Sequence, residues 1–169
     1  YARLNAGIGY VQGMNEIVGH LLYAFTGGQA GNVSEEIEAD VFFCFQKLTQ
    51  SLGDGFCREL DNDPTVGVMA SLNRYHEVLE ACDPELHKHM EKINLQPAFY
   101  AFRWLTLMFT QEFSVPDVMT MWDYLLSADS AKLTAVIHLV AAAMMTLIRA
   151  ELLAMEFNDA IQLLLAYPP

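Results

Sequence analysis

The chain has 169 residues, of which 53% are hydrophobic and 18% are charged, so it is long and apolar enough to bury one full core. Its formal net charge is -12, and its nine lysine and arginine residues form no run. Because nucleic-acid binding depends on clustered basic side chains, this composition argues against a nucleic-acid partner. The three cysteines are far apart in the sequence, which favours reduced thiols in a cytoplasmic protein over a disulfide framework.

Apolar residues recur at helical spacing along nearly the whole chain, and no convincing strand pattern interrupts them. We therefore expect an all-α fold, a single orthogonal helical domain of about seven to nine helices over residues 1–169. In chain order, helices are expected from about Tyr10 to Gly27, Glu35 to Leu52, Val68 to Ala81, Pro84 to Ile93, Ala98 to Phe113, Pro116 to Ser127, Lys132 to Ala154, and Asn158 to just before Pro168.

Several of these boundaries have a local chemical reason. Gly53-Asp54-Gly55 is expected to interrupt the second helix, with a short continuation over Phe56–Leu60 and a turn at Asp61–Pro64. Asp83 is a good N-cap with Pro84 at the first helical position, and Asn158 is expected to cap the last helix.

The stretch between Lys132 and Arg149 is the one candidate for a membrane span. As a helix it would rise roughly 24 Å, which is shorter than the hydrocarbon core of about 30 Å. It also contains Thr134, His138 and Thr146. We therefore expect a buried core helix and no transmembrane segment.

Few side chains predict metal or nucleotide chemistry. No Gly-x-x-x-x-Gly-Lys-Ser/Thr loop occurs, so we do not expect the chain to bind a nucleotide by itself. His87 and His89 are two residues apart on an expected helix, which turns them about 200° from each other, so we expect surface histidines and no metal site. We expect His20, His76 and His138 to be packing residues.

The segment from Gly7 to Glu16, with sequence GIGYVQGMNE, is the first candidate for function. Its three glycines allow tight turns and close approach of another molecule. Gln12 would then project from the start of a helix, and its carboxamide could hold a water by its oxygen while its amide reaches a phosphate. The alternative is a solvent-exposed glutamine at a loop-to-helix junction.

The second candidate is the aromatic stretch from Phe99 to Phe113, which contains Arg103. An arginine among aromatic side chains needs a carboxylate partner, and the candidates are Glu112, Glu16 and Asp123. An ion pair that orients helices is favoured over a catalytic arginine. Trp122 is interpreted as a core anchor.

These motifs in this order resemble the TBC domain of Rab GTPase-activating proteins, and most closely its member-13-like subgroup. The family's Tyr-x-Gln-Gly-Met motif is matched by Tyr10-Val11-Gln12-Gly13-Met14. Its later signature is matched by Arg103-Trp104, Glu112-Phe113 and Trp122-Asp123. The similarity runs from about Asn5 to Tyr167, and the chain resembles the C-terminal portion of the domain.

The resemblance implies a mechanism in which two side chains are supplied to a Rab-family small GTPase. Gln12 would be the catalytic glutamine finger, and the residues expected to contact the GTPase are Tyr10, Gly13, Met14 and Asn15. The residues expected to support the site are Glu16, Arg103, Trp104, Glu112, Trp122 and Asp123. The protein would need no cofactor of its own, because GTP and Mg²⁺ would belong to the partner.

The family's arginine finger lies in an Ile-x-x-Asp-x-x-Arg motif that should precede Gln12 by more than the eleven residues present. No arginine of the chain matches this motif, so we expect the 169 residues alone to be nearly inactive. A non-catalytic module that docks Rab proteins or effectors, and a helical scaffold, remain the alternatives. We expect a cytoplasmic protein that reaches endomembranes only through its partner.

Overall fold

The computed structural model describes residues 1–29, 31, 33–53 and 66–168. Within these ranges there are nine α-helices, two short 3-10 helices and no strand, which confirms the all-α prediction. The elements are α1 Met14–Thr26, α2 Glu35–Leu52, α3 Gly67–Cys82, α4 Pro84–Lys92, η3 Pro97–Phe99, α5 Ala101–Thr106, α6 Val115–Ser127, η4 Ser130–Lys132, α7 Leu133–Leu147, α8 Arg149–Leu153 and α9 Phe157–Leu165. The continuation expected at Phe56–Leu60 and the turn expected at Asp61–Pro64 lie outside the described residues.

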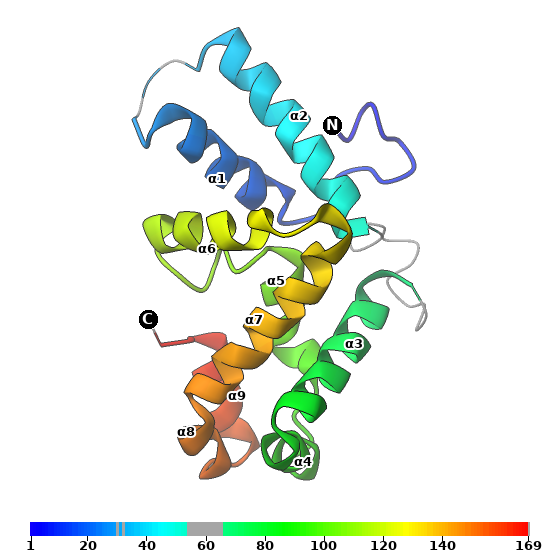
Figure 1. Ribbon diagram of the computed structural model, residues 1–169, viewed down its shortest axis with the longest axis vertical. Helices are drawn as coiled ribbons and strands as arrows, with labels where there is room; N and C mark the ends of the chain where they lie inside the picture. The colour runs from blue at the N-terminus through cyan, green and yellow to red at the C-terminus, as the bar shows by residue number, and fades with distance from the viewer. Residues whose placement is uncertain (30, 32, 54–65, 169) are drawn as a thin grey trace.

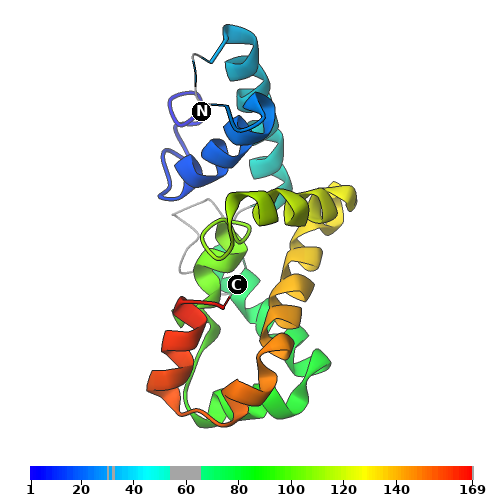
Figure 2. The same cartoon turned by 90° about the vertical axis from the view of Figure 1, so that its left-hand side faces the viewer.

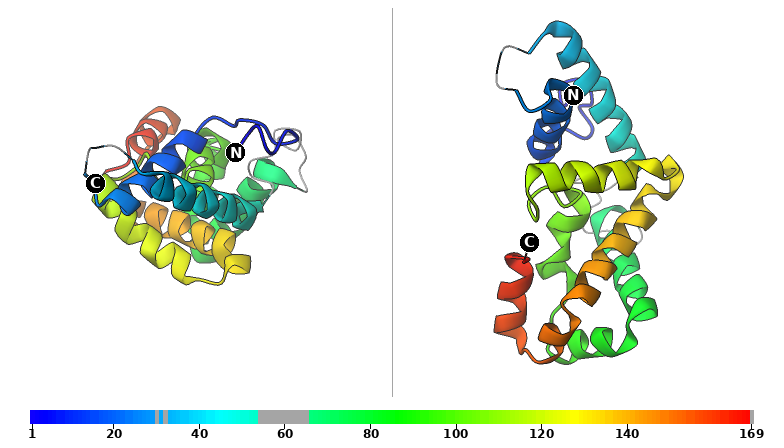
Figure 3. Two further views of the ribbon diagram at one scale, coloured as in Figure 1. Left: turned by 90° about the horizontal axis from the view of Figure 1, so that it is seen from above. Right: turned by 60° about the vertical axis from the view of Figure 1, so that its left-hand side comes forward.

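The helices form an elongated body with the α1–α2 pair at one end (Figure 1). Helix α6 crosses beneath α1, and α3 and α7 run side by side toward the other end, where α4, α8 and α9 lie (Figures 1 and 2). The views of Figure 3 show the same arrangement from above and from a further side. Buried side chains from both ends belong to one contiguous hydrophobic core, among them Ile17, Phe45, Tyr75, Trp104 and Leu164.

The corner between α3 and α4 is built by one aspartate. Asp83 follows the last residue of α3, and its Oδ1 accepts a hydrogen bond from the backbone N–H of Leu86 at 3.0 Å, with Pro84 in the first turn of α4. Arg149 Nε donates to Asp83 Oδ2 at 2.6 Å, and the same guanidinium pairs with Glu85. The predicted N-cap is therefore confirmed, and it is also tied to a distant helix.

The expectation of a single helix from Ala98 to Phe113 was wrong. Helix α5 stops at Thr106, and the chain then turns through Met108 and Phe109, which have left-handed φ values of 50° and 64°. Such φ values cost energy for residues other than glycine, and tertiary contacts hold them here. Both side chains are fully buried, and the carbonyl of Met108 accepts a hydrogen bond from Trp122 Nε1 at 3.0 Å.

The long helix expected from Lys132 to Ala154 is interrupted at Ile148, between α7 and α8. The interruption adjoins Arg149, whose side chain reaches the α3–α4 corner. The expected cap of the last helix was also wrong, because Glu156 occupies the N-cap position and Asn158 lies in the first turn of α9.

By length and composition, Ser130–Leu147 could cross a membrane, with a mean hydropathy of 1.5 over 18 residues. In the fold, α7 packs against α3, α5 and α6, and 39% of this stretch is buried. One face of α7 therefore lies in the core, while most of the stretch is not fully buried.

Candidate functional site

Gln12 lies two residues before α1 and is exposed to solvent. The helix begins at Met14 rather than near Tyr10, because Gly13 takes a left-handed conformation with φ 100° and ψ -15° at the N-cap. A Cβ at Gly13 would lie 2.3 Å from Cδ2 of Leu107, so only glycine fits this position without a shift of its neighbour. The turn thus combines a left-handed backbone with close packing against the segment after α5, and it holds Gln12 away from the core.

A cleft of about 710 Å³ lies where the glutamine segment meets α5 and the turn after it. Gln12, Tyr10 and Asn15 line one side, together with other residues of the same segment. The other side is lined by Phe102, Arg103, Thr106, Leu107 and Gln111. Gln12 therefore lies at the surface and at a cleft, as the finger hypothesis requires.

A short chain of hydrogen bonds orders the surface beside Gln12. The hydroxyl of Tyr10 donates to Oδ1 of Asn15 at 2.8 Å, and Nδ2 of Asn15 donates to Oε1 of Glu16 at 3.3 Å. Tyr10 and Asn15 are exposed, which leaves both available to a partner. Met14 differs, because its side chain is 4% exposed and belongs to the core, so it has little surface left for a contact.

Arg103 forms an ion pair with Glu112, one of the three carboxylates considered from the sequence. Its Nη2 donates to Glu112 Oε2 at 2.8 Å, and its Nε lies 2.6 Å from Oε1. The same guanidinium donates to the backbone carbonyl of Leu165 in α9. The Glu112 side chain is 1% exposed while that of Arg103 is 30% exposed, so the pair neutralises a buried carboxylate and ties the α5 segment to α9.

Both tryptophans are core residues, as expected for Trp122. Trp104 is fully buried, with its ring 5.2 Å from that of Tyr100 and 5.7 Å from that of Tyr167 between centroids. Trp122 packs against the buried His20 at a centroid distance of 5.7 Å. Asp123 and Glu16, the other carboxylates considered for Arg103, make no ion pair within the described residues, and Asp123 is exposed.

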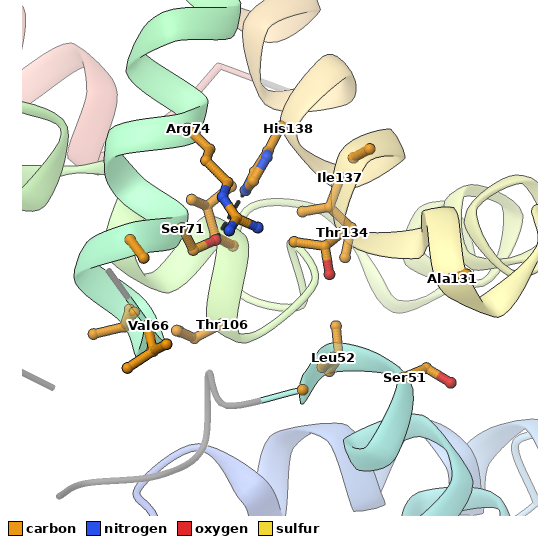
Figure 4. Close-up of a pocket in the computed structure, with 16 residues that line it drawn as sticks. Ser51, Leu52, Val66, Ser71, Arg74, Thr106, Ala131, Thr134, Ile137 and His138 are labelled. Atoms are coloured by element: carbon orange, nitrogen blue, oxygen red, sulfur yellow. Dashed lines mark hydrogen bonds between the residues drawn. The ribbon is translucent and has the colours of Figure 1, made fainter. Parts of the chain in front are cut away.

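A second pocket of about 390 Å³ lies between α3 and α7, with α2 and α5 at its edge. Figure 4 shows Ser71, Arg74 and His138 pointing toward one another there. Ser71 Oγ and His138 Nε2 are 2.8 Å apart. Burial, with a smaller contribution from Arg74, lowers the pKa of His138 to about 4, so the ring is neutral near pH 7. His138 is thus the packing residue that we expected.

Sequence reasoning missed part of the cleft opposite Gln12. Thr106, Leu107 and Gln111 line it only because the chain leaves the helix after Thr106. No local signal indicated that departure, since apolar residues continue at helical spacing through Phe113. The expectation that His87 is a surface histidine was also wrong. His87 is 7% exposed and contacts His76 on the neighbouring helix.

Known proteins are similar to this chain in sequence and in fold. The family model described as the Rab-GTPase-TBC domain matches residues 1–153. TBC1 domain family member 13 of Homo sapiens is 44% identical over 168 residues, which cover 99% of this chain and 41% of that protein. GTPase-activating protein gyp1 of Schizosaccharomyces pombe is 26% identical over 183 residues, covering 99% of this chain and 34% of that protein. The chain therefore spans well under half the length of these curated relatives.

The crystal structure of the Ypt/Rab-GAP domain of Gyp1p matches with a TM-score of 0.86 at 24% sequence identity. The match covers 99% of this chain and 56% of that one, and it shows that the two folds are alike. The family model covers most of the chain, and the human relative is similar along nearly all of it. The chain belongs to the Rab-GTPase-TBC domain family.

Proposed function

We propose that this chain is the part of a Rab GTPase-activating protein that presents Gln12 to the GTP bound by a Rab-type GTPase. The observation that carries the proposal is the position of Gln12. It is exposed, it lines a cleft, and it precedes a left-handed turn at Gly13, where a Cβ would require Leu107 to shift. The gyp1 relative, named as a GTPase-activating protein, supports the same reaction class.

The proposed role of Gln12 follows from carboxamide chemistry. Its oxygen accepts a hydrogen bond from the attacking water, and its amide group donates to an oxygen of the terminal phosphate. The packed turn at Gly13 limits the motion of the backbone beneath it, so less entropy is lost when the side chain is positioned. GTP and Mg²⁺ belong to the partner, while Tyr10 and Asn15 offer a hydroxyl and an amide to its surface.

We further propose that the arginine finger comes from outside these 169 residues. No arginine of the chain stands in an Ile-x-x-Asp-x-x-Arg motif. Arg103, the arginine that lines the cleft, is bonded to the buried Glu112 and to a carbonyl of α9. An arginine finger contributes about 10³ to 10⁵ in rate, or roughly 4–7 kcal/mol of barrier, which Gln12 alone does not replace. We place the activity in the cytoplasm, with membrane recruitment through the GTPase.

The experiment is single-turnover GTP hydrolysis by a panel of GTP-loaded Rab proteins. The full-length protein, its Gln12→Ala variant and the 169-residue chain are compared at equal concentration. Full-length protein is expected to accelerate at least one Rab, whereas Gln12→Ala and the 169-residue chain lose most of that acceleration. Gln111→Ala is the matched control, since Gln111 is an exposed glutamine that lines the same cleft.

Three outcomes would contradict the proposal in different ways. If full-length protein binds GTP-loaded Rab proteins without accelerating any, the chain belongs to a docking module. If it neither binds any Rab nor accelerates GTP hydrolysis by one, the helical-scaffold alternative is favoured. If Gln12→Ala is as fast as wild type while Gln111→Ala is slow, the glutamine has been assigned to the wrong residue.

A further inference from the structure

The corner between α3 and α4 brings together three side chains that are typical metal ligands. His76 comes from α3, and His87 and Glu91 come from α4. Nε2 of His76 lies 2.8 Å from Nε2 of His87, and one ligand atom of each of the three residues lies within 4.8 Å of the others. These residues lie outside the cleft that Gln12 lines, and the proposed GTPase reaction does not use them.

The local structure explains why the three meet. His87 and Glu91 are four residues apart on one helix, so they share a face. Nδ1 of His87 lies 3.8 Å from Oε2 of Glu91, and Nε2 of His76 lies 4.0 Å from Oε1. The α3–α4 corner is fixed by the Asp83 cap and by Arg149, so the two helices present their ligands from a rigid frame.

We propose that His76, His87 and Glu91 bind a divalent transition-metal ion, with Zn²⁺ as the expected ion. Two imidazole nitrogens and one carboxylate form a donor set that suits zinc, and three protein ligands leave a fourth position for water. Magnesium and calcium prefer all-oxygen sites, which disfavours both here.

The distances require only small adjustments. With Zn–N bonds of about 2.0–2.1 Å, two tetrahedral ligand nitrogens lie roughly 3.3 Å apart, so the two rings must separate by about half an ångström. Oε1 of Glu91 lies 4.0 Å from Nε2 of His76 and must approach it by about 0.7 Å. The Glu91 side chain is 59% exposed and free to turn, whereas the His87 side chain is 8% exposed and supplies a fixed anchor.

The short-range contacts of the site and its access to solvent also favour a metal. Nδ1 of His76 is buried without a hydrogen-bond partner among the described residues, so its contact with His87 is the one polar contact that its ring makes at short range. His76 and Glu91 line a pocket of about 370 Å³, together with Asn73, Asn94 and Gln96. An ion and its water can enter through this pocket.

The site would connect two helices that already pack together. Because the ligands come from α3 and α4 and meet only in the folded chain, a bound ion stabilises the folded state by RT ln(1 + [ion]/Kd). The amides of Asn73 and Asn94 line the same pocket and could bond to a water on the ion. The proposed site is therefore a structural one, with one coordination position open to water.

The test is calorimetric titration of the metal-free protein with Zn²⁺, combined with melting curves and with the visible spectrum of the Co²⁺ form. Wild type is expected to bind one ion per chain, to melt at a higher temperature with zinc, and to give the spectrum of tetrahedral cobalt with nitrogen and oxygen ligands. His76→Gln and Glu91→Gln should each weaken binding by at least about tenfold.

Two controls keep a folding defect separate from a lost site. His89 lies on the same helix but contacts the backbone carbonyl of Met155 and not the proposed site. The His89→Gln variant should therefore bind zinc like wild type. The metal-free variants should melt near metal-free wild type, since His76 and Glu91 are partly exposed. Failure of wild type to bind, equal binding by His76→Gln, or a cobalt–thiolate spectrum from the exposed Cys44 or Cys82 would each overturn the proposal.

Discussion

Replacing Gly13 with alanine tests whether the turn that presents Gln12 depends on glycine. The left-handed conformation at φ 100° costs a residue with a Cβ about 1–2 kcal/mol. The added Cβ would also lie 2.3 Å from Cδ2 of Leu107, and overpacking of this kind typically costs about 1–3 kcal/mol. Gly13→Ala should therefore lower the free energy of unfolding by about 2–5 kcal/mol, with the smaller value if Leu107 can turn aside.

Urea unfolding followed by tryptophan fluorescence measures this change. The sequence has two tryptophans, Trp104 and Trp122, and both are buried, so their emission reports loss of the core. In melting curves, a domain of this size loses roughly 2–4 °C for each kcal/mol, so a shift of several degrees is expected.

Two comparisons identify the cause of any loss. Gly7→Ala places a methyl group where no atom lies within 4 Å and where φ is not positive, so it should be nearly neutral. In a Leu107→Ala background the clash disappears, and Gly13→Ala should then cost only its backbone component. If Gly13→Ala is as stable as Gly7→Ala, within about 0.5 kcal/mol, glycine is not required at this turn.

Three further predictions concern polar groups of the core. Arg103→Ala should cost about 3–5 kcal/mol of stability because it leaves the buried Glu112 carboxylate unpaired. If the variant unfolds in urea like wild type but has lost activity, Arg103 has a catalytic role instead. Asp83→Asn keeps a capping oxygen and loses the charge opposite Arg149, whereas Asp83→Ala also loses about 1 kcal/mol of capping. Asp83→Asn should therefore lower the melting temperature less than Asp83→Ala does. Equal losses would refute the capping role. Because the pKa of His138 is about 4 in the fold and about 6.5 when unfolded, the unfolded chain binds the extra proton between these values. Stability should therefore be full above pH 6.5 and fall by up to about 1.4 kcal/mol per unit as the pH drops toward 4, and urea titrations of His138→Gln should show a shallower dependence.

Helices whose ends depend on nearby residues could be predicted from the sequence. The α2 boundaries, the Asp83–Pro84 corner and the α6 start at Val115-Pro116 all follow from caps, prolines and glycines within a few positions. These signals work because a cap is a hydrogen bond between neighbours in the chain. Gln12 and Arg103 were also identified as candidates from the sequence, since their motifs lie within short segments, but Glu112 was only one of three possible partners for Arg103.

Elements that depend on distant contacts could not be predicted in the same way. The left-handed turn at Met108 and Phe109 is held by burial and by the bond from Trp122, so the sequence pattern alone indicated a continuous helix. The break before Arg149 likewise adjoins a pair with Asp83, 66 residues earlier.

The sequence alone determined the helical class, the motif around Gln12 and the family resemblance, because each depends on residues close together or in a fixed order. Only the tertiary structure decided that Gln12 faces a cleft shared with Gln111, and that His76 meets His87 and Glu91. The physical reason is that both arrangements join elements through packing between helices. The spacing of residues along one chain does not record which helix faces will meet.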